Sequence, residues 1–294
     1  MKALVINNEF GGGYGDVAIS LYALKELINS AATQYEVQLY VRVIEHLELV
    51  KTLVELLALP VTVLDFQGYA IDSAVGDIQV RFEISSPDGV PTDVSVIDNV
   101  NGIIKRIAVP NFLRLKDCYK AVIPLLCYEL DVPHIKASCN KALVSRNALF
   151  HINEHTNRSS RCVTSQYYVN IINGMHDLGI IDRVYLTVHD ENQYVKNLLP
   201  KLRADCIVIE EPLRGVLTLI REELPLIVTH STGILHLGAM LGCRTIELCP
   251  PAKPEIETEI WHPPTCDCNH TVFYDKSEIE VLCDVSLWEV SCSH

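Results

Sequence analysis

One short segment of the chain combines residue types that bind phosphate. The apolar run Leu226–Val228 predicts a buried strand, and Ser231, Thr232 and Gly233 stand at the start of an expected helix. The first N–H groups of a helix have no partner within it, and the helix dipole adds about half a positive charge there. Glycine lets a ligand come close to the backbone. His236 follows one turn later, on the same side as Gly233. These residues predict a site for a nucleotide diphosphate that needs no metal ion.

The same residues also fit a purely structural role. Serine and threonine are common at the N-cap of ordinary helices. In that case Ser231 or Thr232 only caps the helix, and His236 packs against neighbours or faces solvent.

A glycine-rich turn, Gly11–Gly15, follows the first expected strand and leads to Asp16. It does not match the dinucleotide-binding fingerprint, and no Lys-Ser or Lys-Thr pair follows it as in a P-loop. At this position the Asp16 carboxylate would accept a proton from an attacking hydroxyl, which is general base catalysis. Alternatively, Asp16 is the N-cap of a helix that begins at Val17, and the two roles can coexist. The residues of this turn predicted on the acceptor side are Gly13, Tyr14 and Gly15.

Both loops need strands and helices to present them, and the sequence supplies these in two similar series. In the first half, the expected strands are Lys2–Asn7, Val37–Val43, Val61–Phe66, Val80–Ile84 and Val94–Ile97, with helices at Val17–Ile28 and His46–Leu57. In the second half, the expected strands are Ala148–Ile152, Arg183–Val188, Cys206–Ile209, Leu226–Val228 and Thr245–Leu248. The helices expected between them are Ser165–Leu178, Asn192–Leu199, Leu213–Glu222 and Gly233–Leu241. Such alternation predicts parallel sheets covered by helices.

The sequence therefore predicts an α/β fold with two Rossmann-like, doubly wound domains, residues 1–140 and 147–294. Ligands of such sheets collect at the C-terminal ends of the strands, where both special loops are expected. Two domains that face each other across a cleft would bring the two loops together.

Length and composition agree with an ordinary globular protein. The chain has 294 residues, of which 49% are hydrophobic and 21% are charged, enough for two cores. We find no uninterrupted apolar run long enough to be a transmembrane segment and no signal peptide at the N-terminus, and we expect a cytoplasmic protein.

Charge is distributed unevenly along the chain. The net charge of −13 disfavours a protein that binds long stretches of nucleic acid. Residues 1–104 are strongly acidic, whereas residues 105–146 are rich in basic residues and hold only three acidic ones. These basic residues are Lys105, Arg106, Arg114, Lys116, Lys120, Lys136, Lys141 and Arg146. They indicate either a compact anionic partner, such as a phosphorylated glycan or a short length of nucleic acid, or a solvated helix face.

The eleven cysteines do not form a disulfide pattern, because their number is odd and they are scattered over the chain. We interpret most of them as small buried apolar residues. The segment with Cys266, Cys268, Cys283 and Cys292, near His262 and His270, lacks a second tight pair of ligands, so we expect no metal site.

Together, the two loops resemble those of the heptosyltransferase-like glycosyltransferases of the GT-B fold, which include the lipopolysaccharide heptosyltransferases. That family opens with a strand, a short loop, and Gly-Asp before an apolar helix, as in Gly15-Asp16 and the residues up to Leu24. Its second signature is Asp-Thr-Gly, two residues, then His and a small-residue helix ending in Leu-Gly. The chain has this pattern from Ser231 to Gly242, with Ser231 in the place of the aspartate, and Pro250-Pro251 in the place of a later Gly-Pro.

The resemblance implies a role for several residues. It makes Asp16 the catalytic base, and Ser231, Thr232, Gly233 and His236 the contacts of the donor. It also implies that Arg158 or Arg161 meets the diphosphate, and that Glu210 or Glu211 holds the ribose diol. The first domain would take the acceptor, with Lys105, Arg106, Arg114 and Lys116 among its contacts, and the second would bind the nucleotide sugar.

We therefore predict a metal-independent, inverting glycosyltransferase that moves a hexosyl, pentosyl or heptosyl group from a nucleotide diphosphate sugar to a hydroxyl. It needs no cofactor beyond that co-substrate. Its acceptor would be anionic, either an envelope glycan such as the lipopolysaccharide core or DNA that carries a modified base. Two alternatives are a catalytically silent nucleotide-sugar-binding module and a nucleotide-sugar epimerase of the same architecture. The sequence does not identify the oligomeric state.

Overall fold

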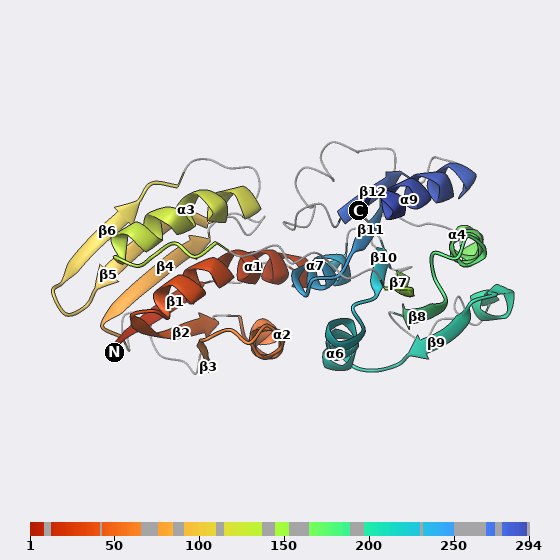
Figure 1. Cartoon of the computed structure of the whole chain (residues 1–294). Helices are drawn as coiled ribbons and strands as arrows, with labels where there is room; N and C mark the ends of the chain where they lie inside the picture. The colour runs from red at the N-terminus through yellow and green to blue at the C-terminus, as the bar shows by residue number, and fades with distance from the viewer. Residues whose placement is uncertain are drawn as a thin grey trace. The chain divides into compact units, whose positions relative to one another are not determined.

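The computed structural model describes residues 1–8, 13–41, 43–65, 76–84, 91–109, 115–136, 145–152, 165–188, 197–229, 232–249, 269–273 and 278–292. The chain divides into two compact units, Met1–Ser138 and Cys139–His294 (Figure 1). Each unit contains a six-stranded sheet with helices packed on it, which confirms the predicted α/β class.

The first unit has a sheet whose centre is parallel and whose edge is antiparallel. In chain order its elements are β1 (Lys2–Asn8), α1 (Tyr14–Ala31), β2 (Tyr35–Val41), α2 (Ile44–Leu56), β3 (Thr62–Asp65), β4 (Ile78–Ile84), β5 (Pro91–Asp98), β6 (Ile103–Ile107) and α3 (Leu115–Glu129). The strand order is β3-β2-β1-β4-β5-β6. β3, β2, β1 and β4 pair with one another in parallel, so the chain crosses from one side of β1 to the other between β3 and β4.

The antiparallel edge corrects the expectation that the sheet of this unit is parallel. β5 pairs antiparallel with β4 and with β6, and no helix intervenes. A tight turn joins β5 to β6, because the Asp98 carboxylate accepts the N–H groups of Val100 and Asn101 at 3.0 and 2.9 Å. Gly102, at φ +66°, closes this turn in a conformation that favours glycine. Antiparallel strands need only such a short connection, whereas parallel strands need a crossover.

The second unit has a fully parallel, doubly wound sheet. Its first elements are β7 (Asn147–Ile152), α4 (Ser165–Asp177), β8 (Arg183–Val188), the 3-10 turn η2 (Leu199–Lys201), β9 (Asp205–Ile209) and α6 (Leu213–Glu223). They are followed by β10 (Leu226–Thr229), α7 (Gly233–Met240), β11 (Thr245–Cys249), β12 (Asn269–Phe273) and α9 (Glu278–Cys292). The order β12-β11-β10-β7-β8-β9 reverses direction at β7 and β10, and this is where ligands of such sheets bind.

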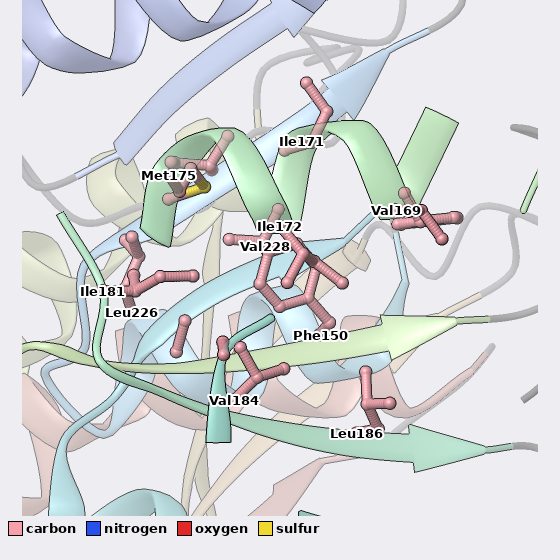
Figure 2. Close-up of a cluster of buried hydrophobic side chains, with 14 of the residues drawn as sticks. Phe150, Val169, Ile171, Ile172, Met175, Ile181, Val184, Leu186, Leu226 and Val228 are labelled. Atoms are coloured by element: carbon pink, nitrogen blue, oxygen red, sulfur yellow. The ribbon is translucent and has the colours of Figure 1, made fainter. Parts of the chain in front are cut away.

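The two faces of this sheet are covered by different helices. Phe150, Leu186 and Val228 point to one face and pack against Ile172 and Met175 of α4 (Figure 2). Neighbouring residues on a strand point to opposite faces, so Ile227 points the other way, where it contacts Gly238 of α7. Both faces are buried, which explains the nearly continuous apolar runs in these strands.

Gly238 allows α7 to lie close to β10, and its replacement should destabilise the second unit. A Cβ atom at Gly238 would lie 2.6 Å from Cγ1 of the fully buried Ile227. We expect Gly238→Ala to lower the free energy of unfolding by about 1–3 kcal/mol, measured by urea denaturation, because this contact overpacks the interface. A free energy of unfolding equal to that of the wild type would contradict this interpretation.

Candidate active site

Asp16 lies in the first turn of α1, at the carboxyl end of β1. The helix begins at Tyr14, and its N-cap is Gly13 in an extended conformation. One oxygen of the Asp16 carboxylate, Oδ2, accepts the Gly13 N–H at 2.8 Å. The prediction that Asp16 is the N-cap of a helix from Val17 is therefore wrong. The carboxylate three residues after the N-cap binds the backbone N–H of the N-cap residue, as the N3 residue does in a capping box.

This contact fixes the position of Asp16 without burying it. The side chain is half-buried, and a negative charge in the first turn is stabilised by the helix dipole. The neighbouring Tyr14 is 47% exposed, and its ring meets the buried His46 of α2 edge-on, with ring centres 6.1 Å apart. Gly13 has open space where a side chain would stand. Gly13, Tyr14, Gly15 and Asp16 thus lie at the start of α1, and their contact with a ligand stays a prediction.

The sequence analysis did not identify Asn8, the last residue of β1. Its side chain is fully buried, and the Tyr119 hydroxyl donates to Asn8 Oδ1 at 3.0 Å. Within the described ranges Asn8 Nδ2 has no hydrogen-bond partner. Burial raises the pKa of Tyr119, so this hydroxyl stays protonated and acts as the donor. The only signal in the sequence is the pair of asparagines that ends an apolar strand.

The structure does not bring the predicted basic residues together around Asp16. Lys105 and Arg106 lie on the edge strand β6 and are exposed. Lys105 Nζ lies 2.6 Å from Glu129 Oε2, at the end of α3 away from its first turn. This contact raises the pKa of Lys105. Arg114 and the side chain of Lys116 lie outside the described residues, so their predicted roles stay predictions.

A cavity of about 560 Å³ opens beside this ion pair. Its lining consists of Lys105, Cys127, Tyr128, Glu129, Asp131, Val132 and Pro133. These residues belong to β6 and to the end of α3, whereas Asp16 belongs to the start of α1. The cavity is therefore separate from the candidate base.

The first turn of α7 has the features of an anion-binding site. Thr232 is the N-cap residue in an extended conformation, but its hydroxyl makes no capping hydrogen bond. The Thr232 carbonyl accepts the Leu235 N–H at 3.1 Å. The side chain of Thr232 therefore does not bind the first N–H groups of the helix, as it would in an ordinary cap. Ser231 lies outside the described residues.

His236 lies one turn into α7 and is only 4% exposed, so it does not face solvent. Every residue from Ile234 to Met240 is buried, which places this short helix inside the unit rather than on its surface. A histidine in such surroundings requires polar contacts, because an unpaired buried polar group is costly. This burial removes one of the two alternatives for His236, namely solvent exposure.

A row of polar side chains crosses the second sheet beside α7. Thr187, His151, Thr229 and Glu247 are direct neighbours on β8, β7, β10 and β11, and all four are buried. His151 Nδ1 lies 2.8 Å from Thr187 Oγ1, and the Thr229 hydroxyl donates to the His151 carbonyl at 2.9 Å. The row lies near the carboxyl ends of the strands, at the place in the sheet where the strand order reverses. Sequence analysis missed it, because only the strand register reveals that these residues are adjacent.

The remaining predicted donor contacts are only partly described. Glu210 and Glu211 are exposed and lie between β9 and α6, which starts after its N-cap Pro212. β9 is the edge strand, and β7 and β8 lie between it and β10. Arg158 and Arg161 lie outside the described residues, so their contact with a diphosphate stays a prediction.

Across the ranges given above, no cluster of three or more histidine, cysteine or acidic side chains could hold a metal ion. Of the predicted cysteine segment, only the Cys283 side chain is described, and it is exposed. Cys118, Cys127 and Cys243 are buried free thiols, and burial raises the pKa of Cys118 to about 11 and of Cys243 to about 12. These three thiols are small apolar core residues, as interpreted from the sequence.

None of the helices in the described part of the chain combines the length and the apolar character needed to cross a membrane.

Comparison with solved structures identifies the fold as that of the GT-B heptosyltransferases. The chain is similar to a glycosyl transferase of family 9 from Veillonella parvula, with a TM-score of 0.62 and 13% identity, over 99% of this chain and 97% of that one. It is also similar to the E. coli heptosyltransferase WaaC with ADP, with a TM-score of 0.63 and 13% identity, over 98% of this chain and 100% of that one. The E. coli ADP-heptose lps heptosyltransferase II gives a TM-score of 0.62 and 14% identity, over the full length of both chains.

No protein-family model matches the chain, and neither does any curated protein sequence. The fold expected from the two loops is confirmed by these structural similarities, which extend over both units.

Proposed function

We propose that the protein transfers a glycosyl group from a nucleoside diphosphate sugar to a hydroxyl group. The observation that carries this proposal is the first turn of α7, at the point where the second sheet reverses direction, whose N-cap residue Thr232 makes no side-chain cap. A helix start of this kind stabilises a diphosphate through its N–H groups and dipole. The shared fold of the heptosyltransferases supports the same reaction class.

The first donor that we propose is an adenosine diphosphate sugar. One similar E. coli structure contains ADP and another contains ADP-2-deoxy-2-fluoro heptose. In this chain, Thr232, Gly233 and His236 would contact the diphosphate, with Arg158 or Arg161 adding positive charge, and Glu210 or Glu211 would hold the ribose. Ser231 would stand near the transferred sugar. The identity of that sugar is left to experiment.

The reaction would proceed by direct displacement. The acceptor oxygen forms a bond to the anomeric carbon as the bond from that carbon to the diphosphate breaks, and the configuration inverts. Asp16 takes the proton of the acceptor hydroxyl. The negative charge that grows on the departing diphosphate is stabilised by the start of α7 and by His236, so the proposal needs no metal ion.

The acceptor is proposed to be anionic, because basic residues cluster between positions 105 and 146. Arg106 is exposed on β6 and can contact such a molecule. A phosphorylated envelope glycan would give activity with modest salt dependence, whereas DNA that carries a modified base would give a steep one through counterion release.

A thermal-shift panel of nucleoside diphosphates and nucleoside diphosphate sugars tests the donor proposal. A ligand at a hundred times its Kd stabilises the fold by about 2.7 kcal/mol. We expect one nucleoside diphosphate to raise the Tm selectively, and its nucleoside without phosphates to have a much smaller effect. If no compound shifts the Tm, the donor site does not exist as proposed. Release of nucleoside diphosphate only when an acceptor is present would separate transfer from the silent-module and epimerase alternatives.

A further inference from the structure

The polar row of the second sheet lies next to a row that is apolar. One residue earlier on the same strands, Leu186, Phe150, Val228 and Ile246 form a row that is entirely apolar. In the polar row, Thr229 is fully buried and stands between His151 and Glu247. A buried hydroxyl stabilises a protein only through its hydrogen bonds, and valine would fill the same volume without that requirement. The hydroxyl of Thr229 therefore needs a specific explanation.

The hydrogen bonds of Thr229 connect β7 to the start of α7. Its single hydroxyl proton is donated to the His151 carbonyl at 2.9 Å. In its contact with Thr232, where the two Oγ1 atoms lie 3.4 Å apart, Thr229 can therefore only accept. This contact is long, and it orients the Thr232 hydroxyl towards the sheet. The same residue, Thr232, makes no capping bond to α7.

We propose that Thr229 is a positioning residue for the donor diphosphate. By holding the Thr232 side chain towards β10, it keeps that side chain from capping α7 and leaves the first N–H groups of the helix for the phosphate oxygens. Its bond to His151 fixes this arrangement to β7, the strand at which the sheet reverses direction. The inference rests on the proposed function, because it assigns the start of α7 to a diphosphate.

The test compares Thr229→Val, which keeps the shape of the side chain and removes the hydroxyl, with Thr229→Ser, which keeps the hydroxyl. Isothermal titration calorimetry is carried out with ADP, inorganic pyrophosphate and adenosine. We expect Thr229→Val to raise the Kd for ADP and pyrophosphate by on the order of tenfold and to leave that for adenosine unchanged. Thr229→Ser should stay within about twofold of the wild type for all three. A structural defect would instead weaken adenosine binding as well.

A double-mutant cycle with Thr232→Val shows whether Thr229 acts through Thr232. If it does, the double variant binds pyrophosphate no more weakly than Thr232→Val alone. Wild-type affinity of Thr229→Val for ADP and pyrophosphate overturns the positioning role and leaves the donor site intact. A double variant that binds pyrophosphate more weakly than Thr232→Val alone overturns it as well, because Thr229 would then act without the Thr232 hydroxyl. If the wild-type protein binds neither ADP nor pyrophosphate, the proposed function fails, and this inference fails with it.

Discussion

Asp16→Asn is expected to lower kcat by about 10²–10⁴-fold, the usual contribution of a general base, while the Kd for the donor stays unchanged. An amide cannot take the proton of the acceptor hydroxyl. Its oxygen can still accept the Gly13 N–H, which the carboxylate now binds at 2.8 Å, so the start of α1 should remain intact. Initial rates with saturating donor, together with donor titration by calorimetry, measure the two quantities separately.

Asp98→Asn is the matched control for this variant. Asp98 is also in the first unit, and its carboxylate also accepts backbone N–H groups, from Val100 and Asn101. Asp98 lies at the end of β5 that pairs with the start of β4. This is the amino end of the parallel strands, whereas Asp16 lies at their carboxyl end. Asp98→Asn should therefore keep normal turnover. Normal turnover in Asp16→Asn would remove Asp16 from the chemistry and leave it with the helix contact alone.

His236→Ala is expected to reduce kcat/KM by about a hundredfold, because removing one group that stabilises a developing anion costs on the order of 3 kcal/mol. Binding of nucleoside diphosphate should weaken in parallel, and the Tm shift seen with the wild type should be lost. Because His236 is buried, the free energy of unfolding has to be measured for the same variant. His236→Gln retains an N–H donor and should recover part of the lost binding.

His176→Ala provides the control for the loss of a histidine in the same unit. His176 is in the last turn of α4, so it lies at the amino end of the sheet, away from the start of α7. Its replacement should leave donor binding unchanged. If His236→Ala binds the nucleoside diphosphate as tightly as the wild type, His236 is a packing residue of α7 and the diphosphate contact has to be assigned elsewhere.

The part of the second unit from β7 to β11 could be predicted because most of its elements carry a local signal, whereas β12 and α9 were not predicted. β8 was expected at Arg183–Val188 and is found there, and α6 and α7 start at the predicted residues Leu213 and Gly233. Short apolar runs alternate with longer segments, so length and the flanking glycine and proline residues separate strands from helices. The loop from Thr229 to Gly233 was recognised for the same reason, since it joins two such elements directly.

The parts that were missed depend on contacts between distant residues or on weaker local patterns. β6 has exposed residues at four of its five positions, and α3 contains Pro124, so neither has a clear periodic pattern. The antiparallel order of β4, β5 and β6 follows from pairing, which composition does not show. The expected helix Asn192–Leu199 lies mostly outside the described residues, and at its end the chain forms η2.

The same limit applies to the candidate site. Thr187, His151 and Thr229 belong to three different strands, and their adjacency requires the register of the whole sheet. The roles of Asp16 and His236 were inferred from short sequence motifs, which local pattern can reveal. Local pattern cannot reveal the hydrogen bonds that support those motifs.

The pairing of β7 with β10 also has a consequence for the order in which the second unit can fold. The hydrogen bond from Thr229 to the His151 carbonyl joins residues 78 positions apart. The described elements between them are α4, β8, η2, β9 and α6, and these must be accommodated before this central contact forms. Contacts between residues so far apart in the sequence slow folding. Closing the loop between them costs conformational entropy before the contact stabilises the fold. During synthesis, the proposed diphosphate site would therefore be assembled late, only after β10 and α7 have left the ribosome.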